Sequence, residues 1–211
     1  MKKIIAIASL VLMFAVCLTS CGGKKDYEAG SKDFTFDCLT ITLTESFDVQ
    51  REIDANQDKT YIFHGDYITY TSASGTSVTI ERLEPNGDVR ELAESDLVKT
   101  KGLDLNCKIL EINEGENDEK YFKTGKTVQK TENGPVFTYC YYVFTVYDKS
   151  GSYTYLKAFF NEGIYSYSVC LSTTESAYYG DTKRPEKDPG YQEYFINWLN
   201  SVNIAIPQSQ T

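Results

Sequence analysis

The sequence predicts an α+β domain in which helices cover a mainly antiparallel sheet, as in an α/β/α sandwich. Strand-like runs follow one another at short intervals over residues 127–171, which is typical of antiparallel strands joined by tight turns. The longest run is apolar on both faces, and residues 88–101 and 191–202 have apolar side chains at helical spacing. Strands covered on both faces, together with amphipathic helices, favour this fold class.

Short strands are expected before the first helix, because runs of β-branched and aromatic residues are separated there by turn residues. Gly65-Asp66 and Ser74-Gly75 are such turns. The expected strands are residues 39–43, 61–63, 67–71 and 77–82. The first helix is then expected over residues 88–101, with Gly102 as its stop. Its apolar residues at helical spacing are Val89, Leu92, Ala93 and Leu97.

A four-stranded antiparallel meander is expected in the middle of the chain. Turn residues at 132–135, 149–152 and 161–163 separate the runs. The run 136–147 carries apolar side chains at both parities, which predicts that both faces of the sheet are covered, most simply by helices. The expected strands are residues 127–130, 136–147, 153–160 and 164–171.

The second helix is expected near the C-terminus. Asp188 can cap it and Pro189 suits a first turn. Its apolar residues fall at i, i+3, i+4, i+7, i+8 and i+11. These residues are Tyr191, Tyr194, Phe195, Trp198, Leu199 and Val202.

The N-terminus has the pattern of an export signal. Lys2 and Lys3 precede an apolar run, and small residues precede Cys21. The run 4–18 has 15 residues, whereas a helix that crosses a bilayer needs roughly 20. A cleaved signal peptide over residues 1–20 is therefore favoured over an uncleaved membrane anchor.

Leu18-Thr19-Ser20-Cys21 resembles the lipobox of bacterial lipoproteins. The resemblance implies cleavage between Ser20 and Cys21, diacylglycerol on the Cys21 thiol, and a protein held on the extracytoplasmic face of the cell membrane. A lipidated N-terminus and flexible tether are expected over residues 21–32, because residues 22–32 are Gly-rich and charged. A single domain is expected over residues 33–206, followed by a tail over 207–211.

The domain resembles the PsbP and Mog1 superfamily at the level of pattern. The resemblance rests on residues 39–47 (LTITLTESF), on the central meander and on residues 197–204 (NWLNSVNI). It implies an α/β/α sandwich over about residues 34–206. The photosynthetic and nuclear-transport roles of that family are not expected here, because no motif in this sequence supports them.

The excess of acidic over basic residues makes a nucleic-acid partner unfavourable. The chain has 21 basic and 30 acidic residues, a net charge of −9, and no cluster of Lys or Arg. Removing Lys2 and Lys3 with the signal leaves 19 basic against 30 acidic residues, a net charge of −11.

Motifs for chemistry are weak throughout. His64 is the only histidine, and no Gly-x-Ser-x-Gly sequence accompanies it. Residues 54–58 begin like a calcium loop, but Lys59 and Gly65 stand where Gly and Glu are required. Residues 113–119 (NEGENDE) are either a loose cation site or, as we favour, a solvated turn.

Four cysteines remain in the domain after signal removal, with three possible pairings and no metal-binding or redox spacing. We favour buried thiols for Cys38, Cys107, Cys140 and Cys170.

Eight tyrosines lie on the meander and either line its covered faces or form an exposed row that binds a protein, peptide or glycan. They are Tyr139, Tyr141, Tyr142, Tyr147, Tyr153, Tyr155, Tyr165 and Tyr167.

These observations predict a lipid-anchored binding or scaffolding protein of the bacterial envelope, which is not an enzyme and needs no metal or cofactor. Its partners would be the membrane, through the lipid, and an envelope protein, peptide or glycan. The alternative is a cell-surface hydrolase that uses carboxylates or His64. A cleft lined by carboxylates with displaced ionisation would favour the hydrolase, and a closed sandwich whose only open apolar patch is aromatic would favour binding.

Overall fold

A computed structural model provides the structure of the chain. Four of the features predicted above lie outside its described residues: the signal peptide, Cys21, residues 54–58 and His64. The described residues are 30–44, 46–53, 62–63, 65–85, 87–102, 106–129, 131–132, 134–149, 151–183, 188 and 190–205.

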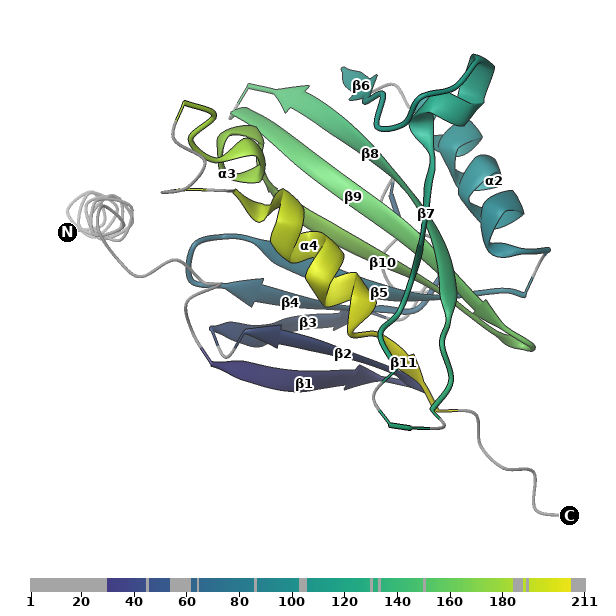
Figure 1. Cartoon of the computed structure of the whole chain (residues 1–211). Coiled ribbons are helices and arrows are strands. Elements are labelled where there is room, and N and C mark those ends of the chain that lie inside the picture. Colours follow the sequence, from purple (N-terminus) through teal and green to yellow (C-terminus); the bar gives the residue numbers. More distant parts are fainter. Residues whose placement is uncertain are drawn as a thin grey trace, which may run out of the picture.

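An eight-stranded antiparallel sheet forms the centre of the fold (Figure 1). Its strand order is β3-β4-β5-β10-β9-β8-β6, and β7 also pairs with β8. The strands are β3 (Phe47–Ile53), β4 (Tyr67–Ser72), β5 (Ser77–Leu83), β6 (Cys107–Ile109), β7 (Lys123–Lys126), β8 (Thr138–Asp148), β9 (Gly151–Glu162) and β10 (Tyr165–Thr174). The mainly antiparallel sheet predicted from the sequence is confirmed.

Helix α2 (Val89–Lys101) and the short 3-10 helix η2 (Asn117–Tyr121) cover one face of this sheet. Asp88 caps α2, because its carboxylate accepts hydrogen bonds from two backbone N–H groups of the first turn. Ala93 and Leu97 are buried against aromatic side chains of the sheet, including Tyr142 and Phe159. Gly102 ends the helix as predicted.

A second, smaller sheet shares the opposite face with helices α3 (Glu175–Tyr179) and α4 (Tyr191–Asn200). It contains β1 (Ser31–Phe36), β2 (Leu39–Thr44) and β11 (Asn203–Ile204) in the order β1-β2-β11. Both faces of the large sheet are covered as predicted, but on this face the small sheet shares that role with the helices. Strand β2 alternates buried apolar residues with partly exposed threonines, so one side of it can pack against the large sheet.

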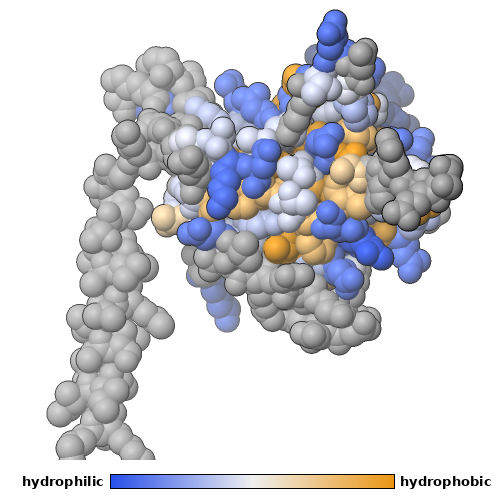
Figure 2. All heavy atoms as spheres, turned by 90° about the horizontal axis from the view of Figure 1, so that it is seen from below, coloured by the Kyte–Doolittle hydropathy of each residue, from blue (hydrophilic) through white to orange (hydrophobic). Residues whose placement is uncertain are grey.

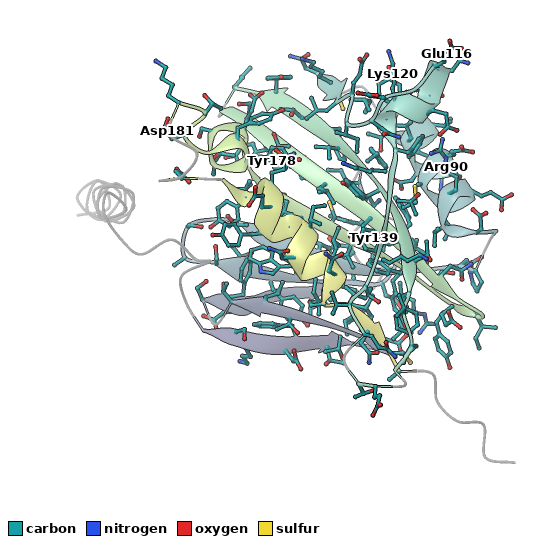
Figure 3. All side chains as sticks on the ribbon, in the orientation of Figure 1. Arg90, Glu116, Lys120, Tyr139, Tyr178 and Asp181 are labelled. Atoms are coloured by element: carbon teal, nitrogen blue, oxygen red, sulfur yellow. The ribbon has the colours of Figure 1, made fainter. Side chains whose placement is uncertain are left out.

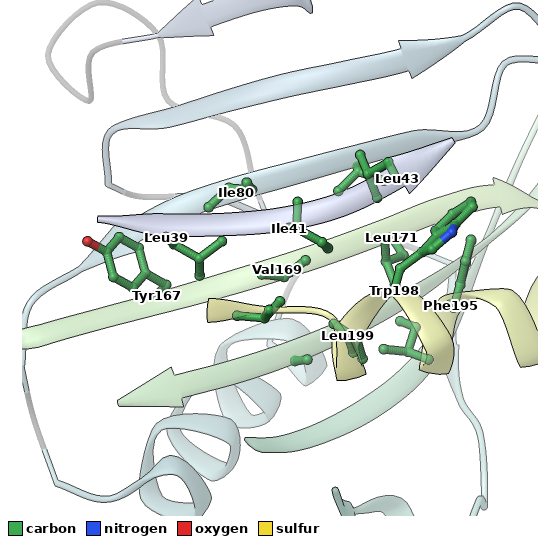
Figure 4. Packing of buried hydrophobic residues seen from close by; sticks show 14 of the residues in the cluster. Leu39, Ile41, Leu43, Ile80, Tyr167, Val169, Leu171, Phe195, Trp198 and Leu199 are labelled. Carbon is green, nitrogen blue, oxygen red and sulfur yellow. The ribbon is translucent and has the colours of Figure 1, made fainter. Parts of the chain in front are cut away.

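Figure 4 shows this packing, with Leu39, Ile41 and Leu43 of β2 beside Val169 and Leu171 of β10.

The apolar stripe predicted for α4 is buried as expected. Phe195 and Leu199 are fully buried, and Trp198 meets Phe47 of β3 edge to face with ring centroids 5.4 Å apart. Edge-to-face contacts of this kind fix α4 against the strands. Tyr191 and Val202 are also buried.

Helix α4 begins later than the sequence predicts. Gly190, at φ 73°, and not Asp188 is its N-cap residue. The Asp188 carboxylate instead accepts a hydrogen bond from the Gly190 N–H at 3.3 Å. A Cβ atom on Gly190 would lie 2.5 Å from the Tyr178 carbonyl oxygen, so this close approach and the positive φ both require glycine. The helix starts only after that contact.

Several strand boundaries also differ from the predicted ones. The first strand of the meander is Lys123–Lys126, not 127–130. The chain leaves β8 at that point, because the Val128 N–H bonds to the Asn200 carbonyl at the end of α4. Ile62 and Phe63 are not in a strand, and β1 begins at Ser31, inside the segment predicted as tether. Strands β1, β3, β6 and β11 were not predicted.

Seen from below, the described residues show hydrophilic side chains with an apolar band between them (Figure 2). Some apolar surface is ordinary for a folded chain. Among the helices of the described ranges, none has both the length and the apolar character to cross a bilayer.

Candidate functional site

An open cleft of about 1210 Å³ lies between helix α2 and the sheet. Strand β5 and the residues after it form one wall, α2 forms another, and Phe159 of β9 contributes from the sheet. Five carboxylate side chains and two basic side chains line the cleft, which gives it an acidic balance. The acids are Asp66, Glu81, Glu84, Glu91 and Asp96, and the bases are Arg82 and Lys99.

A buried lysine lies beside the floor of the cleft. Lys157 of β9 and Glu81 of β5 are each only 1% exposed. The Lys157 Nζ lies 2.9 Å from Asp96 Oδ1 of α2 and 3.6 Å from Glu81 Oε2. It also donates a hydrogen bond of 2.8 Å to the Ile62 carbonyl. One ammonium group therefore joins α2, β5, β9 and the segment before β4.

The two carboxylates have further donors. Glu81 accepts hydrogen bonds from the Gly65 N–H and the Ser168 hydroxyl, both at 2.8 Å. Asp96 accepts a hydrogen bond of 2.5 Å from the Tyr142 hydroxyl. Such bonds compensate for the loss of water around buried charges. With one lysine and two carboxylates, the group keeps one net negative charge.

The ionisation of this group follows from its surroundings. Burial tends to lower the pKa of Lys157, but Asp96 and Glu81 outweigh it, so the pKa is raised and the ammonium stays charged. Burial first, and then the Asp96 charge, raise the pKa of Tyr142 well above its ordinary value. Burial raises the pKa of the nearby Cys170 thiol to about 12. Tyr142 and Cys170 therefore remain protonated at neutral pH.

The group formed by Lys157, Glu81 and Asp96 is better arranged to stabilise the floor of the cleft than to transfer protons. Lys157 is charged and bonded on three sides, so it lacks the free amine that a nucleophile or base needs. The buried carboxylates accept hydrogen bonds from fixed donors. Two of the lining acids, Asp66 and Glu84, are exposed at the rim. Within the described ranges, no set of three or more His, Cys, Asp or Glu residues could hold a metal ion.

The acidic segment 113–119 supports the fold instead of forming a separate site. Asp118 pairs with Lys101 at 2.9 Å, and Glu119 pairs with Arg90 at 3.0 Å. Both bases belong to α2, so these pairs hold η2 against that helix. Arg90 also stacks on the Phe122 ring at 3.9 Å.

The cysteines and the tyrosines of the meander lie only partly in the core. The thiols of Cys38, Cys107, Cys140 and Cys170 are free; Cys140 and Cys170 are buried and the other two are half-buried. Four of the eight tyrosines are buried and line a covered face, and the other four are half-buried. Tyr139 donates to Asn200 Oδ1 at 2.7 Å, and Tyr167 donates to Asp37 Oδ2 at the same distance.

Lys157, Glu81 and Asp96 were not predicted as site residues. A signal for the lysine was present: it interrupts the otherwise apolar and aromatic run 153–160 in a strand predicted to be covered on both faces. A charged residue at such a position needs a buried partner. The identity of the partners depends on the strand order, which one sequence does not reveal.

Comparison with solved structures gives distant neighbours. Cyanobacterial PsbP from Synechocystis has a TM-score of 0.48 at 13% identity, covering 88% of this chain and 97% of its own. The Ran-binding protein Mog1p from Saccharomyces cerevisiae has a TM-score of 0.46 at 11% identity, covering 83% of this chain and 96% of its own. Both TM-scores are below 0.5, so the PsbP/Mog1 resemblance noted in the sequence stays a prediction.

A Bacteroides thetaiotaomicron structure has a TM-score of 0.47 at 6% identity and covers 83% of this chain. The match spans about half of that chain, 49%. No protein-family model and no curated protein match the sequence.

Proposed function

We propose that this protein is a lipid-anchored binding protein of the bacterial envelope that takes a cationic group of its ligand, an amine or a guanidinium, into the cleft beside α2. The acidic lining of that cleft is the observation that carries the proposal. Anchoring is proposed from the lipobox-like sequence that ends at Cys21.

The electrostatics of the cleft support a cationic ligand. A cleft lined with charge of one sign concentrates the field and attracts ligands of the opposite sign. The buried group adds one negative charge that water screens little, because it lies beneath the surface. Of the two bases, Arg82 lies 3.8 Å from Asp37, which is not a lining residue. The net negative charge of the lining therefore favours binding of an amine.

The position of the anchor supports access to the cleft. The start of β1, where the chain leaves the proposed tether, and helix α2 lie on opposite sides of the domain (Figure 1). A membrane attached through Cys21 would be nearest the small sheet. The cleft would then face away from the bilayer, toward other envelope components.

A hydrolase remains the second candidate, because two buried carboxylates meet at the floor of one cleft. Paired carboxylates serve glycosidases when one acts as an acid and the other as a base or nucleophile. Here Lys157 pairs with both, so the two carboxylates have the same partner and no difference in setting that would divide these roles between them. A turnover lost on Glu81→Gln or Asp96→Asn, with folding preserved, would decide for the hydrolase.

Trilysine binding tests the cleft. The full-length protein in nanodiscs is titrated with trilysine at low and high salt, with triglutamate as the opposite-charge control. The double substitution Asp66→Asn/Glu84→Gln should weaken binding about tenfold, since each exposed pair contributes up to about 1 kcal/mol. The matched control Glu114→Gln/Glu116→Gln removes the same charge elsewhere and should leave the affinity unchanged. Equal losses in both variants would contradict the proposal.

Membrane fractionation tests the anchor. The Cys21→Ala protein should be released or remain unprocessed, because two acyl chains are needed for stable attachment. A Cys21→Ala protein that stays membrane-bound at mature size and carries labelled lipid would rule out this anchor.

A further inference from the structure

A second pocket, separate from the cleft, lies on the opposite face of the large sheet. Its volume is about 300 Å³, and residues of α3, α4, β8, β9 and the segment after β6 line it. Most of the lining is aliphatic or aromatic, including Val143, Leu156 and Ile196. A small, mainly apolar cavity with a few placed polar groups is the usual form of a small-molecule site.

Two tyrosine hydroxyls are the distinctive polar groups of this pocket. Tyr141 is 8% exposed and Tyr178 is 3% exposed, and neither hydroxyl has a hydrogen-bond partner among the described residues. No fully enclosed side-chain oxygen of those residues lacks a partner. Both hydroxyl oxygens therefore keep some accessible surface, and both residues line the pocket. Buried tyrosines elsewhere in the fold, such as Tyr139 and Tyr142, have protein partners.

The two hydroxyls are available as donors. Burial raises the pKa of Tyr178, and it also raises the pKa of Tyr141, so both keep their protons at neutral pH. The electrostatic influence of Tyr141 on Tyr178 places the two side chains near each other. Two neighbouring O–H donors with no acceptor among the described residues suit a ligand that carries acceptor oxygens. Figure 3 shows Tyr178 beside the start of α4.

A lysine supplies positive charge at the mouth of the pocket. Lys123 lies directly opposite Tyr141 in the β7–β8 pair, and residues opposite each other point to the same face of a sheet. Lys123 is exposed, lines the pocket, and forms no ion pair with a described carboxylate. The one acid in the lining, Glu111, is already paired with Lys120 at 2.5 Å. The mouth therefore favours an anion.

We infer that this pocket binds a small aromatic or aliphatic carboxylate. The apolar body would fill the cavity between Val143, Leu156 and Ile196. The carboxylate would accept hydrogen bonds from the Tyr141 and Tyr178 hydroxyls and pair with Lys123. The exposed ring of Tyr179, 5.1 Å from the Tyr178 ring, would cover the bound body at the rim. This site is independent of the acidic cleft.

Hydrocinnamate is a suitable probe, with phenylpropylamine as a control of similar shape and opposite charge. Binding to the full-length protein in nanodiscs is measured by saturation-transfer NMR and calorimetry, and empty nanodiscs give the partition background. Hydrocinnamate should bind above that background and phenylpropylamine should not. Tyr141→Phe and Tyr178→Phe should each weaken binding about tenfold, the effect of a hydrogen bond to a charged group.

Matched controls separate the site from general effects. Lys123→Gln should weaken binding several-fold, whereas Lys126→Gln on the same strand should not. Tyr165→Phe, on the same meander but outside the lining, should also leave hydrocinnamate binding unchanged. Asp66→Asn/Glu84→Gln, in the cleft, should leave hydrocinnamate binding intact, so that failure of one site does not imply failure of the other. Hydrocinnamate binding at background level, equal binding of the amine, or affinity unchanged in both tyrosine variants would overturn the inference.

Discussion

The Lys157→Met substitution is expected to be among the most destabilising changes available in this domain. Methionine nearly fills the volume of the lysine stem, so packing is little altered, but the charge is removed. Glu81 and Asp96 are then left buried and facing each other without their shared cation. The side chain of Lys157 is 1% exposed, so water does not take over its role.

The expected cost follows from the burial of the group. Removing one partner of a buried ion pair typically costs about 3 to 5 kcal/mol, because it leaves an uncompensated charge. In a domain of this size, each kcal/mol lowers the melting temperature by about 2 to 4 °C. We therefore expect a loss of roughly 6 to 20 °C. Tyr142→Phe removes one donor from Asp96 but keeps Lys157, and should cost about 1 to 3 kcal/mol.

Urea unfolding of the purified protein measures these differences, and a partial-rescue variant tests the cause. Adding Glu81→Gln and Asp96→Asn to Lys157→Met removes the uncompensated charges and should recover part of the lost stability. A loss below about 1 kcal/mol for Lys157→Met, or a triple variant less stable than the single one, would refute the reasoning that charge burial is responsible.

Three further changes test other parts of the fold by the same unfolding measurement. Trp198→Ala should cost about 3 to 5 kcal/mol, because the ring is buried against Phe47 and Phe195; an unchanged midpoint would place α4 outside the core. Asp88→Ala should cost about 1 kcal/mol by removing the cap of α2, and an equal cost in Glu114→Ala, at an exposed acid, would point to general charge effects instead. The free energy of unfolding should fall as pH rises from 9.0 toward about 12, because the Cys170 thiol ionises over that range only in the unfolded chain. Cys170→Ala should reduce this fall by about 1.4 kcal/mol per pH unit. An identical slope in both proteins would contradict this prediction.

The elements predicted best are those whose pattern is local. The α2 stop at Gly102 and the apolar stripe of α4 follow from spacing and capping chemistry. The meander follows from turn residues between apolar runs, apart from its first strand. The start of α4 was misplaced because the conformation of Gly190 depends on a contact with Tyr178, and no local pattern records that contact.

The small sheet and the site depend on long-range pairing. Strand β11 pairs with β2 from the far end of the chain, so its two residues carry no strand signal of their own. Glu81 is paired with Lys157 across the intervening strand β10. Their meeting requires the strand order, which is not encoded in any single segment. The acidic cleft was likewise not predicted, because its acids come from β5, α2 and the turn before β4.

Zero-length crosslinking tests the proposed function most directly. A carbodiimide joins an amine to a carboxylate only where the two are in contact, so trilysine crosslinked to the full-length protein reports where it binds. The cleft account predicts amide bonds at Asp66, Glu84 or Glu91, suppressed by high salt, with little at Glu114 and Glu116. Crosslinks spread evenly over exposed acids, or concentrated on residues 113–119, would contradict it.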